Sequence, residues 1–221
     1  MQRPLYRRNQ LTAGIVHIGI GNFHRAHQAW YVHQLMQEGR GLDWAIVGAG
    51  VRSFDSQQRE KLKEQDYLTT LLELQPNEIS AQVIGSMIDF IPITEGHTAL
   101  IDRITQPDIR IVSLTITEGG YYTDHSTGGL DLKHPDIVHD ISQPGSPCTV
   151  FGALVVALKQ RRLLGMRGFT CMSCDNIQGN GALLKQAVLS LAKQVDGDLA
   201  LWIEDVCSFP NSMVDCIVPA T

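Results

Sequence analysis

The sequence lacks any apolar run close to the roughly 20 residues that a membrane-spanning helix requires. It also lacks a basic excess, because 18 lysine and arginine residues against 23 aspartate and glutamate residues give a formal net charge of -5. Nucleic-acid-binding proteins normally carry a clustered basic face, so this balance argues against that class. The basic N-terminal segment is not followed by the apolar core of a signal peptide. We therefore expect a cytoplasmic protein without nucleic-acid or membrane partners.

Cysteines are few, and their number is odd. The five are Cys148, Cys171, Cys174, Cys207 and Cys216. An odd set without compact spacing is typical of a reducing compartment, where thiols serve as small buried side chains. Cys171 and Cys174 form a C-x-x-C pair, the spacing of a redox motif or of half a zinc site. They follow an apolar run that begins at Phe169, and residues three apart on a strand point to opposite faces, so we expect two thiols that do not converge.

Short apolar runs alternate with helical patterns along the chain. Strands are predicted at residues 15–19, 45–48, 109–117 and 169–174. Helices are predicted at residues 25–38, 56–65, 98–104, 150–162, 182–194 and 199–206. Strands that alternate with helices predict an α/β fold with a doubly wound, Rossmann-like sheet.

Two segments interrupt this alternation. Residues 67–74 and 81–88 alternate loosely on either side of Pro76 and Asn77, which predicts a β-hairpin-like insertion. Residues 118–147 are rich in glycine, proline, aspartate and histidine, which predicts a loop. No internal repeat, low-complexity tract or obvious linker divides the chain, so we predict a single domain over residues 1–221.

The first predicted strand runs into a glycine turn. Gly19 and Gly21 would let the backbone turn tightly and approach a diphosphate at the N-terminus of the next helix. His24 stands where the usual third glycine would be, so the pattern G-x-G-x-x-H is a weak fingerprint by itself. Its place in a first strand–helix unit favours a dinucleotide site over an ordinary turn.

A dinucleotide site of this kind needs an acidic residue for the adenosine ribose near the end of the second strand. Asp43 has the right spacing but precedes that strand, whereas Asp55 lies just beyond it. A carboxylate at position 55 would accept the ribose hydroxyls and repel a 2′-phosphate, which favours NAD over NADP. Arg52 has the opposite effect, because its positive charge favours NADP. From spacing alone, Asp55 could equally well be a solvated loop carboxylate.

Four segments together resemble the mannitol dehydrogenase family of polyol-specific long-chain dehydrogenases. They are residues 14–29 (GIVHIGIGNFHRAHQA), 111–121 (IVSLTITEGGY), 172–181 (MSCDNIQGNG) and 209–221 (FPNSMVDCIVPAT). They cover nearly the whole chain in the family's order, which is far more specific than the glycine turn.

The resemblance implies a dinucleotide-binding N-terminal domain, a mostly helical C-terminal domain, and zinc-free oxidation of a secondary alcohol to a ketone, such as mannitol to fructose. It implies that NAD is surrounded by Gly19, Gly21, Phe23 and Arg25, with Asp55 at the ribose. It further implies that Asn176 stabilises charge on the reacting oxygen. Glu118 would border the proton's exit route, and Asp215 would contact a substrate hydroxyl.

Simpler structural roles are open for some of these residues. Asn176 or its neighbour Asp175 could cap the helix that follows. Glu118 could belong to a plain turn before two glycines. His24 and His27 have helical i, i+3 spacing, but no third ligand or converging carboxylate accompanies them, so we predict no metal site.

The sequence departs from the family pattern in two places. Cys216 follows Asp215 where the family has arginine, which removes a cation and its bidentate geometry. The family's general base, a lysine in a K-x-x-x-x-N-x-x-H arrangement of the C-terminal domain, has no counterpart in these 221 residues. A hydride leaves the carbinol carbon only as the hydroxyl proton is taken up. We therefore expect the chain to bind NAD but to be inactive alone, with the helical C-terminal domain absent from it.

Other functions are left open by the sequence. A hexuronate reductase acting on fructuronate or tagaturonate is the nearest, although residues 41–47 and 117–121 are closer to the mannitol branch. A non-catalytic nucleotide-binding or interaction module would suit the missing lysine motif and Cys216. A zinc or redox module built on Cys171 and Cys174 would contain bound metal, and we expect none.

Overall fold

A five-stranded parallel sheet forms the centre of the molecule. The computed structural model describes residues 2–50, 52, 54–124 and 126–212. The strands run in the order β5 (Met87–Ile91), β2 (Ala45–Ala49), β1 (Ala13–Ile18), β6 (Ile111–Leu114) and β7 (Thr170–Ser173). Each neighbouring pair is parallel. The chain adds strands on one side of β1 and then on the other, so the sheet is doubly wound and its direction reverses between β1 and β6.

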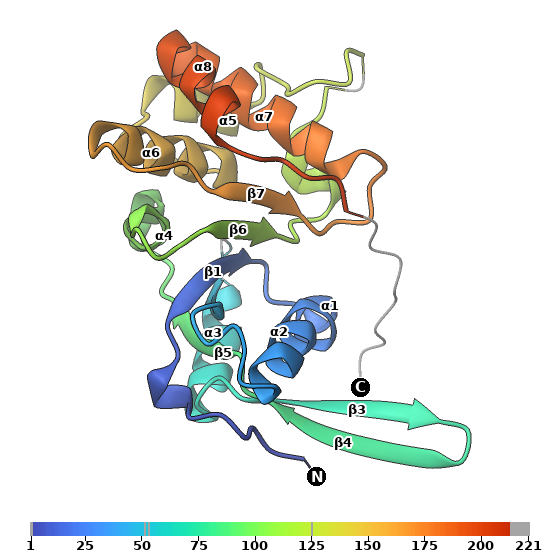
Figure 1. Ribbon diagram of the computed structural model, residues 1–221. Coiled ribbons are helices and arrows are strands. Elements are labelled where there is room, and N and C mark those ends of the chain that lie inside the picture. The colour runs from blue at the N-terminus through green and yellow to red at the C-terminus, as the bar shows by residue number, and fades with distance from the viewer. Residues whose placement is uncertain (1, 51, 53, 125, 213–221) are drawn as a thin grey trace.

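Helices cover both faces of this sheet. They are α1 (Asn22–Ala26), α2 (Gln28–Gln37), α3 (Asp55–Glu64), α4 (Thr98–Thr105), α5 (Pro135–Ser142), α6 (Val150–Leu163), α7 (Asn180–Val195) and α8 (Gly197–Val206). The larger apolar core joins one face of the sheet to α4, α6, α7 and α8, and a smaller core joins the other face to α2 and α3. Figure 1 shows α1 to α3 beside the β1–β2–β5 half and α6 to α8 beside β7.

Side-chain alternation along β1 explains how one strand serves both cores. Every residue of β1 is buried. Val16 and Ile18 belong to the larger core, and Ile15 belongs to the smaller one. Successive strand residues point to opposite faces, so an unbroken apolar run is needed where both faces are covered. The predicted α/β fold with a doubly wound sheet is confirmed.

The hairpin insertion is present, but its second boundary was wrong. Strands β3 (Thr69–Gln75) and β4 (Glu78–Ile84) pair antiparallel and extend away from the sheet (Figure 1). Residues beyond 84 leave the hairpin, and β5 joins the central sheet beside β2. The Ser86 hydroxyl donates to the Ala29 carbonyl across 2.6 Å, and a Cβ at Gly85 would lie 2.9 Å from Pro4. These distant contacts redirect the chain, and the local alternation of residues 81–88 does not reveal them.

Two helical segments also differ from the sequence prediction. The helix predicted at 25–38 is divided at His27, whose φ of -118° and ψ of -85° are not helical. The loop predicted at 118–147 contains helix α5, which begins with Pro135 after a His134 side chain that accepts the Asp136 N–H. Proline suits the first position of a helix because its missing N–H is not needed there. Here proline marks a helix start, although the composition predicted a loop.

Candidate functional site

The glycine turn at the end of β1 has two glycines with different roles. Gly19 has a φ of +94°, and a Cβ there would lie 2.0 Å from the Thr115 carbonyl oxygen. Only glycine fits so close to the neighbouring strand without strain. Gly21, whose N–H donates to the Gly19 carbonyl over 3.0 Å, has no atom within 4 Å of the position of a Cβ. Gly19 therefore allows the chain to turn, and Gly21 leaves open space in front of the backbone.

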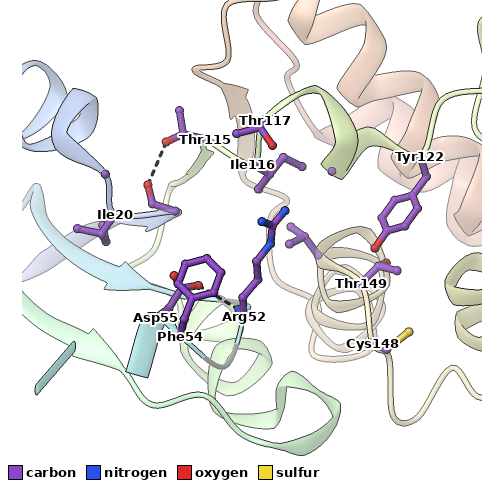
Figure 2. A pocket seen from close by; sticks show the side chains of 14 residues that line it. Ile20, Arg52, Phe54, Asp55, Thr115, Ile116, Thr117, Tyr122, Cys148 and Thr149 are labelled. Carbon is purple, nitrogen blue, oxygen red and sulfur yellow. Dashed lines mark hydrogen bonds between the residues drawn. The ribbon is translucent and has the colours of Figure 1, made fainter. Parts of the chain in front are cut away.

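This turn borders a cavity of about 320 Å³ at the carboxyl ends of β1, β2 and β6. Its volume falls in the range of roughly 300–1,000 Å³ that small-molecule sites occupy. Besides the two glycines, the lining includes Arg52, Phe54, Asp55, Thr115, Thr117, Tyr122, Cys148 and Thr149. Figure 2 shows the residues after β2 and those after β6 on opposite sides of the opening. The cavity thus lies at the point where the strand order reverses, the position at which doubly wound sheets bind ligands.

Asp55 lies in this cavity, and Asp43 does not. Asp55 begins α3, and its Oδ2 accepts the Arg52 N–H over 3.0 Å. A Cβ at Gly50 would lie 2.3 Å from the Asp55 Cβ, so the glycine lets this carboxylate approach the end of β2. Asp43 instead pairs with Arg110 at 2.8 Å, and this hydrogen bond lowers the pKa of its exposed carboxyl. Of the two acidic candidates, only Asp55 shares the cavity with Gly19 and Gly21.

The far wall of the cavity depends on a buried carboxylate that the sequence analysis considered only as a helix cap. Asp175 accepts the backbone N–H groups of Ile116 and Thr117 at 3.2 and 2.9 Å and the Tyr121 hydroxyl at 2.9 Å. Thr117 has a φ of 63° and a ψ of 164°, a conformation that costs about 1–3 kcal/mol for a residue with a side chain. The Asp175 carboxylate holds that strained residue in place.

Glu118 follows Thr117 and Asn176 follows Asp175, and the hydrogen bond between Thr117 and Asp175 therefore brings the two segments together. Glu118 and Asn176 are both exposed, and neither lines the cavity. The cap interpretation of Asn176 and Asp175 was wrong, because the amide oxygen of Asn211 accepts the N–H groups of Gly181 and Ala182 at the start of α7. Asp215 and Cys216 lie outside the residues that the structure describes.

Phe23 and Arg25 lie on α1, next to the turn, but do not line the cavity. The Phe23 ring packs against His27 with ring centres 4.6 Å apart. The Arg25 guanidinium donates to the Gly21 carbonyl at 3.3 Å and to the side chain of Asn22. Burial lowers the pKa of Arg25. Arg25 therefore hydrogen-bonds to the backbone of the glycine turn and does not line the cavity.

Both the sequence and the fold of this chain match one known family. The model of the mannitol dehydrogenase Rossmann domain matches residues 13–221. A mannitol 2-dehydrogenase from Cereibacter sphaeroides is 53% identical over 99% of this chain, and a polyol:NADP oxidoreductase from Gluconobacter oxydans is 43% identical over 99% of it. The structure of Pseudomonas fluorescens mannitol 2-dehydrogenase in a ternary complex with NAD and D-mannitol superimposes with a TM-score of 0.94 at 48% identity over 100% of this chain.

The chain belongs to the mannitol dehydrogenase family. The resemblance inferred from the four motifs is therefore confirmed, and the hexuronate reductase and non-catalytic alternatives are not favoured. The chain spans about half the length of these relatives, at 46% of the Cereibacter protein and 45% of the Pseudomonas one.

A buried histidine pair behind the glycine turn of this family member was not anticipated from its sequence. The rings of His17 and His24 stack with centres 3.8 Å apart, and both are almost fully buried. His17 bonds to the hydroxyl groups of Ser113 and Thr115, each at 2.7 Å, and the Thr115 hydroxyl donates to the Gly19 carbonyl at 3.1 Å. This chain of hydrogen bonds connects the interior of β1 to the cavity wall.

The buried histidine pair should make the folded protein less stable in acid. Burial lowers the pKa of His24 to about 3, whereas an unfolded histidine titrates near 6.5. The unfolded state therefore binds a proton first, and stability is lost as the pH falls below 6.5 toward 3. We expect His24→Phe to reduce the loss of unfolding free energy between pH 7 and pH 5 by about 2 kcal/mol. Urea denaturation of both proteins at the two pH values measures this difference, and equal losses would contradict it.

The C-x-x-C pair behaves as buried structural thiols. Cys171 and Cys174 are both buried and unbonded to each other. Burial raises the pKa of Cys171 well above its usual value and that of Cys174 to about 11. A thiol that stays protonated at neutral pH is a poor nucleophile. The geometry gives no support to a redox or zinc module at this pair.

Within the described residues, none of the helices combines the length and apolar character that crossing a bilayer requires.

Proposed function

We propose that residues 1–221 are the dinucleotide-binding domain of an NAD-dependent oxidoreductase that interconverts a polyol, mannitol, and a 2-ketose, fructose. The observation that carries the proposal is the shared cavity of Gly19, Gly21 and Asp55 at the point where the strand order reverses. The open space at Gly21 suits a diphosphate approaching the backbone, and the Asp55 carboxylate suits two ribose hydroxyls. The Pseudomonas relative with this fold is described in complex with NAD and D-mannitol.

Asp55 and Arg52 set the choice between NAD and NADP in this proposal. The Asp55 carboxylate accepts hydrogen bonds from both ribose hydroxyls and repels a 2′-phosphate. Arg52 lines the same cavity with its guanidinium 5.9 Å from the Phe54 ring, and it would attract that phosphate. The name of the Gluconobacter relative refers to NADP. We assign NAD to this chain because a direct carboxylate contact to the ribose excludes a phosphate at the same oxygen.

Bound NAD would supply the hydride acceptor. Asn176 would donate its amide N–H to the reacting oxygen and stabilise negative charge there. Glu118 would border the route by which the hydroxyl proton leaves, and Asp215 would accept a substrate hydroxyl. The support for Glu118 and Asn176 is their place just beyond the carboxyl ends of β6 and β7, on segments joined through Asp175.

The proton acceptor of the reaction is expected in a helical C-terminal domain. The lysine motif of the family has no counterpart in this sequence. We expect the 221-residue chain to bind NADH saturably and to show no mannitol-dependent reduction of NAD. Titrating the purified chain with NADH while following nucleotide fluorescence measures the first, and absorbance of NADH formed measures the second. A chain that fails to bind NADH would overturn the proposal, and turnover by the chain alone would overturn the need for a further domain.

Replacing Asp55 tests the cofactor assignment. We expect Asp55→Ala to weaken NADH binding by about tenfold or more, because charged hydrogen bonds contribute roughly 1.5–3 kcal/mol. The same change should bring the affinities for NADH and NADPH closer together, whereas Arg52→Ala should move them further apart. Asp43→Ala is the matched control, since Asp43 does not line the cavity, and it should leave NADH binding unchanged. Equal effects of the two aspartate variants would contradict the assignment.

A further inference from the structure

Three side chains with different ligand atoms converge where α5 meets the segment before α6. His139, Asp140 and Cys148 each offer one ligand atom, and these atoms all lie within 4.8 Å of one another. A tetrahedral zinc ion with ligand distances of about 2.0–2.3 Å holds its ligand atoms about 3.3–3.8 Å apart. Closing the remaining gap takes at most about 1–1.5 Å, and the His139 and Cys148 side chains are both exposed.

The hydrogen bonds around this trio leave a lone pair on the His139 ring and on the Asp140 carboxylate. The Nε2 of His139 lies 3.0 Å from the Ser146 carbonyl oxygen. A carbonyl only accepts, so Nε2 carries the proton and Nδ1 carries the lone pair. Metal-binding histidines are usually oriented by such a bond from their second nitrogen. Asp140 Oδ1 accepts the Cys148 N–H at 2.7 Å, whereas Oδ2 accepts from the Thr149 N–H and hydroxyl.

Negative charge is concentrated around Cys148. Asp140 is 2% exposed, and within the described part of the chain it forms no ion pair. The carboxylates of Asp140 and Asp136 both lie near the Cys148 thiol. A bound metal ion would supply positive charge at this point.

We propose that His139, Asp140 and Cys148 bind a divalent cation of the Zn²⁺ class, with water in the fourth position. Nitrogen, oxygen and sulfur ligands together select borderline ions such as Zn²⁺ or Co²⁺ over Mg²⁺. Binding breaks the Cys148 S–H bond, forms a sulfur–metal bond and releases one proton to the buffer. Cys148 also lines the cavity of Gly19 and Asp55, so the ion would lie at its rim. No metal site was predicted from the sequence, because His24 and His27 have no third ligand. The group of His139, Asp140 and Cys148 was not considered there.

Cobalt spectroscopy of the purified, metal-free 221-residue chain tests this site without reference to nucleotide binding. We expect Co²⁺ to produce a saturable sulfur-to-metal charge-transfer band at one equivalent, to be displaced by Zn²⁺, and to be unaffected by excess Mg²⁺. Calorimetric titration in two buffers of different ionisation enthalpy should show release of about one proton.

Matched variants identify the ligands. Cys148→Ser should abolish the charge-transfer band, whereas Cys207→Ser, at a half-buried thiol outside the trio, should retain it. His139→Ala should weaken Co²⁺ affinity at least about tenfold while the band persists at saturation. Asp140 is left intact because it also holds Thr149 at the start of α6. No saturable band in the unmodified chain, or an unchanged band in Cys148→Ser, would overturn the proposal.

Discussion

Gly19→Ala is expected to destabilise the protein severely, by about 3–5 kcal/mol. Two effects add at this position. A side chain at a φ of +94° is strained, and its Cβ would lie 2.0 Å from the Thr115 carbonyl oxygen, so β1 and the segment after β6 would have to separate. For a chain of this length we expect the melting temperature to fall by roughly 6–20 °C. Thermal unfolding followed by circular dichroism measures the change.

Gly21→Ala is the control for this prediction. Gly21 has an ordinary φ of -104°, and its Cβ would meet no atom within 4 Å. Its effect on stability should stay within about 1 kcal/mol, because alanine fits this backbone and loses less freedom on folding. NADH affinity should nevertheless fall about tenfold or more, since the methyl group would occupy the space proposed for the diphosphate. If Gly21→Ala left NADH affinity unchanged, the proposed place of the diphosphate would be wrong, whatever Gly19→Ala does.

Asp175→Ala should cost about 3–5 kcal/mol of unfolding free energy. The change removes the acceptor for the N–H groups of Ile116 and Thr117 and for the Tyr121 hydroxyl. Each buried donor left without a partner costs about 1–3 kcal/mol. Thr117 would also lose the contact that holds its strained backbone, so the cavity wall should relax and NADH binding should weaken. Urea denaturation and NADH titration measure the two effects.

Asn176, next to Asp175, provides the control. It distinguishes the loss of the Asp175 hydrogen bonds from a general sensitivity of this segment to substitution. Asn176 is exposed, and Asn176→Ala should change the unfolding free energy by no more than about 0.5 kcal/mol. Asp175→Asn keeps one acceptor oxygen and should recover part of the stability lost in Asp175→Ala. Comparable destabilisation by Asp175→Ala and Asn176→Ala would show that the carboxylate does not hold the wall of the cavity.

The features that could be predicted depend on neighbours in the chain. The apolar run of β1, the glycine turn and the preference for Asp55 over Asp43 all follow from local order, because a strand, its turn and the next helix are consecutive. Helix α5 is local too, but its glycine, proline and histidine neighbours have the composition of a loop, and Pro135 is compatible with either.

The features that were missed join residues far apart in the sequence. Thr117 and Asp175 are 58 residues apart, and His17 and Ser113 are 96 apart. No periodicity connects such pairs, and a buried aspartate has the same sequence signal as a helix cap. The change of direction at Ser86 similarly depends on the Ala29 carbonyl, 57 residues away.

The sequence by itself determined the alternation of strands and helices, the glycine turn after the first strand and the family to which these motifs belong. Only the tertiary structure decided that Asp175 holds the strained wall of the cavity, that His17 and His24 stack behind the turn, and that His139 and Asp140 meet Cys148. The physical reason is that hydrophobic periodicity and turn chemistry act over a few residues, whereas the partner of a buried polar group is chosen by whichever distant segment packs against it.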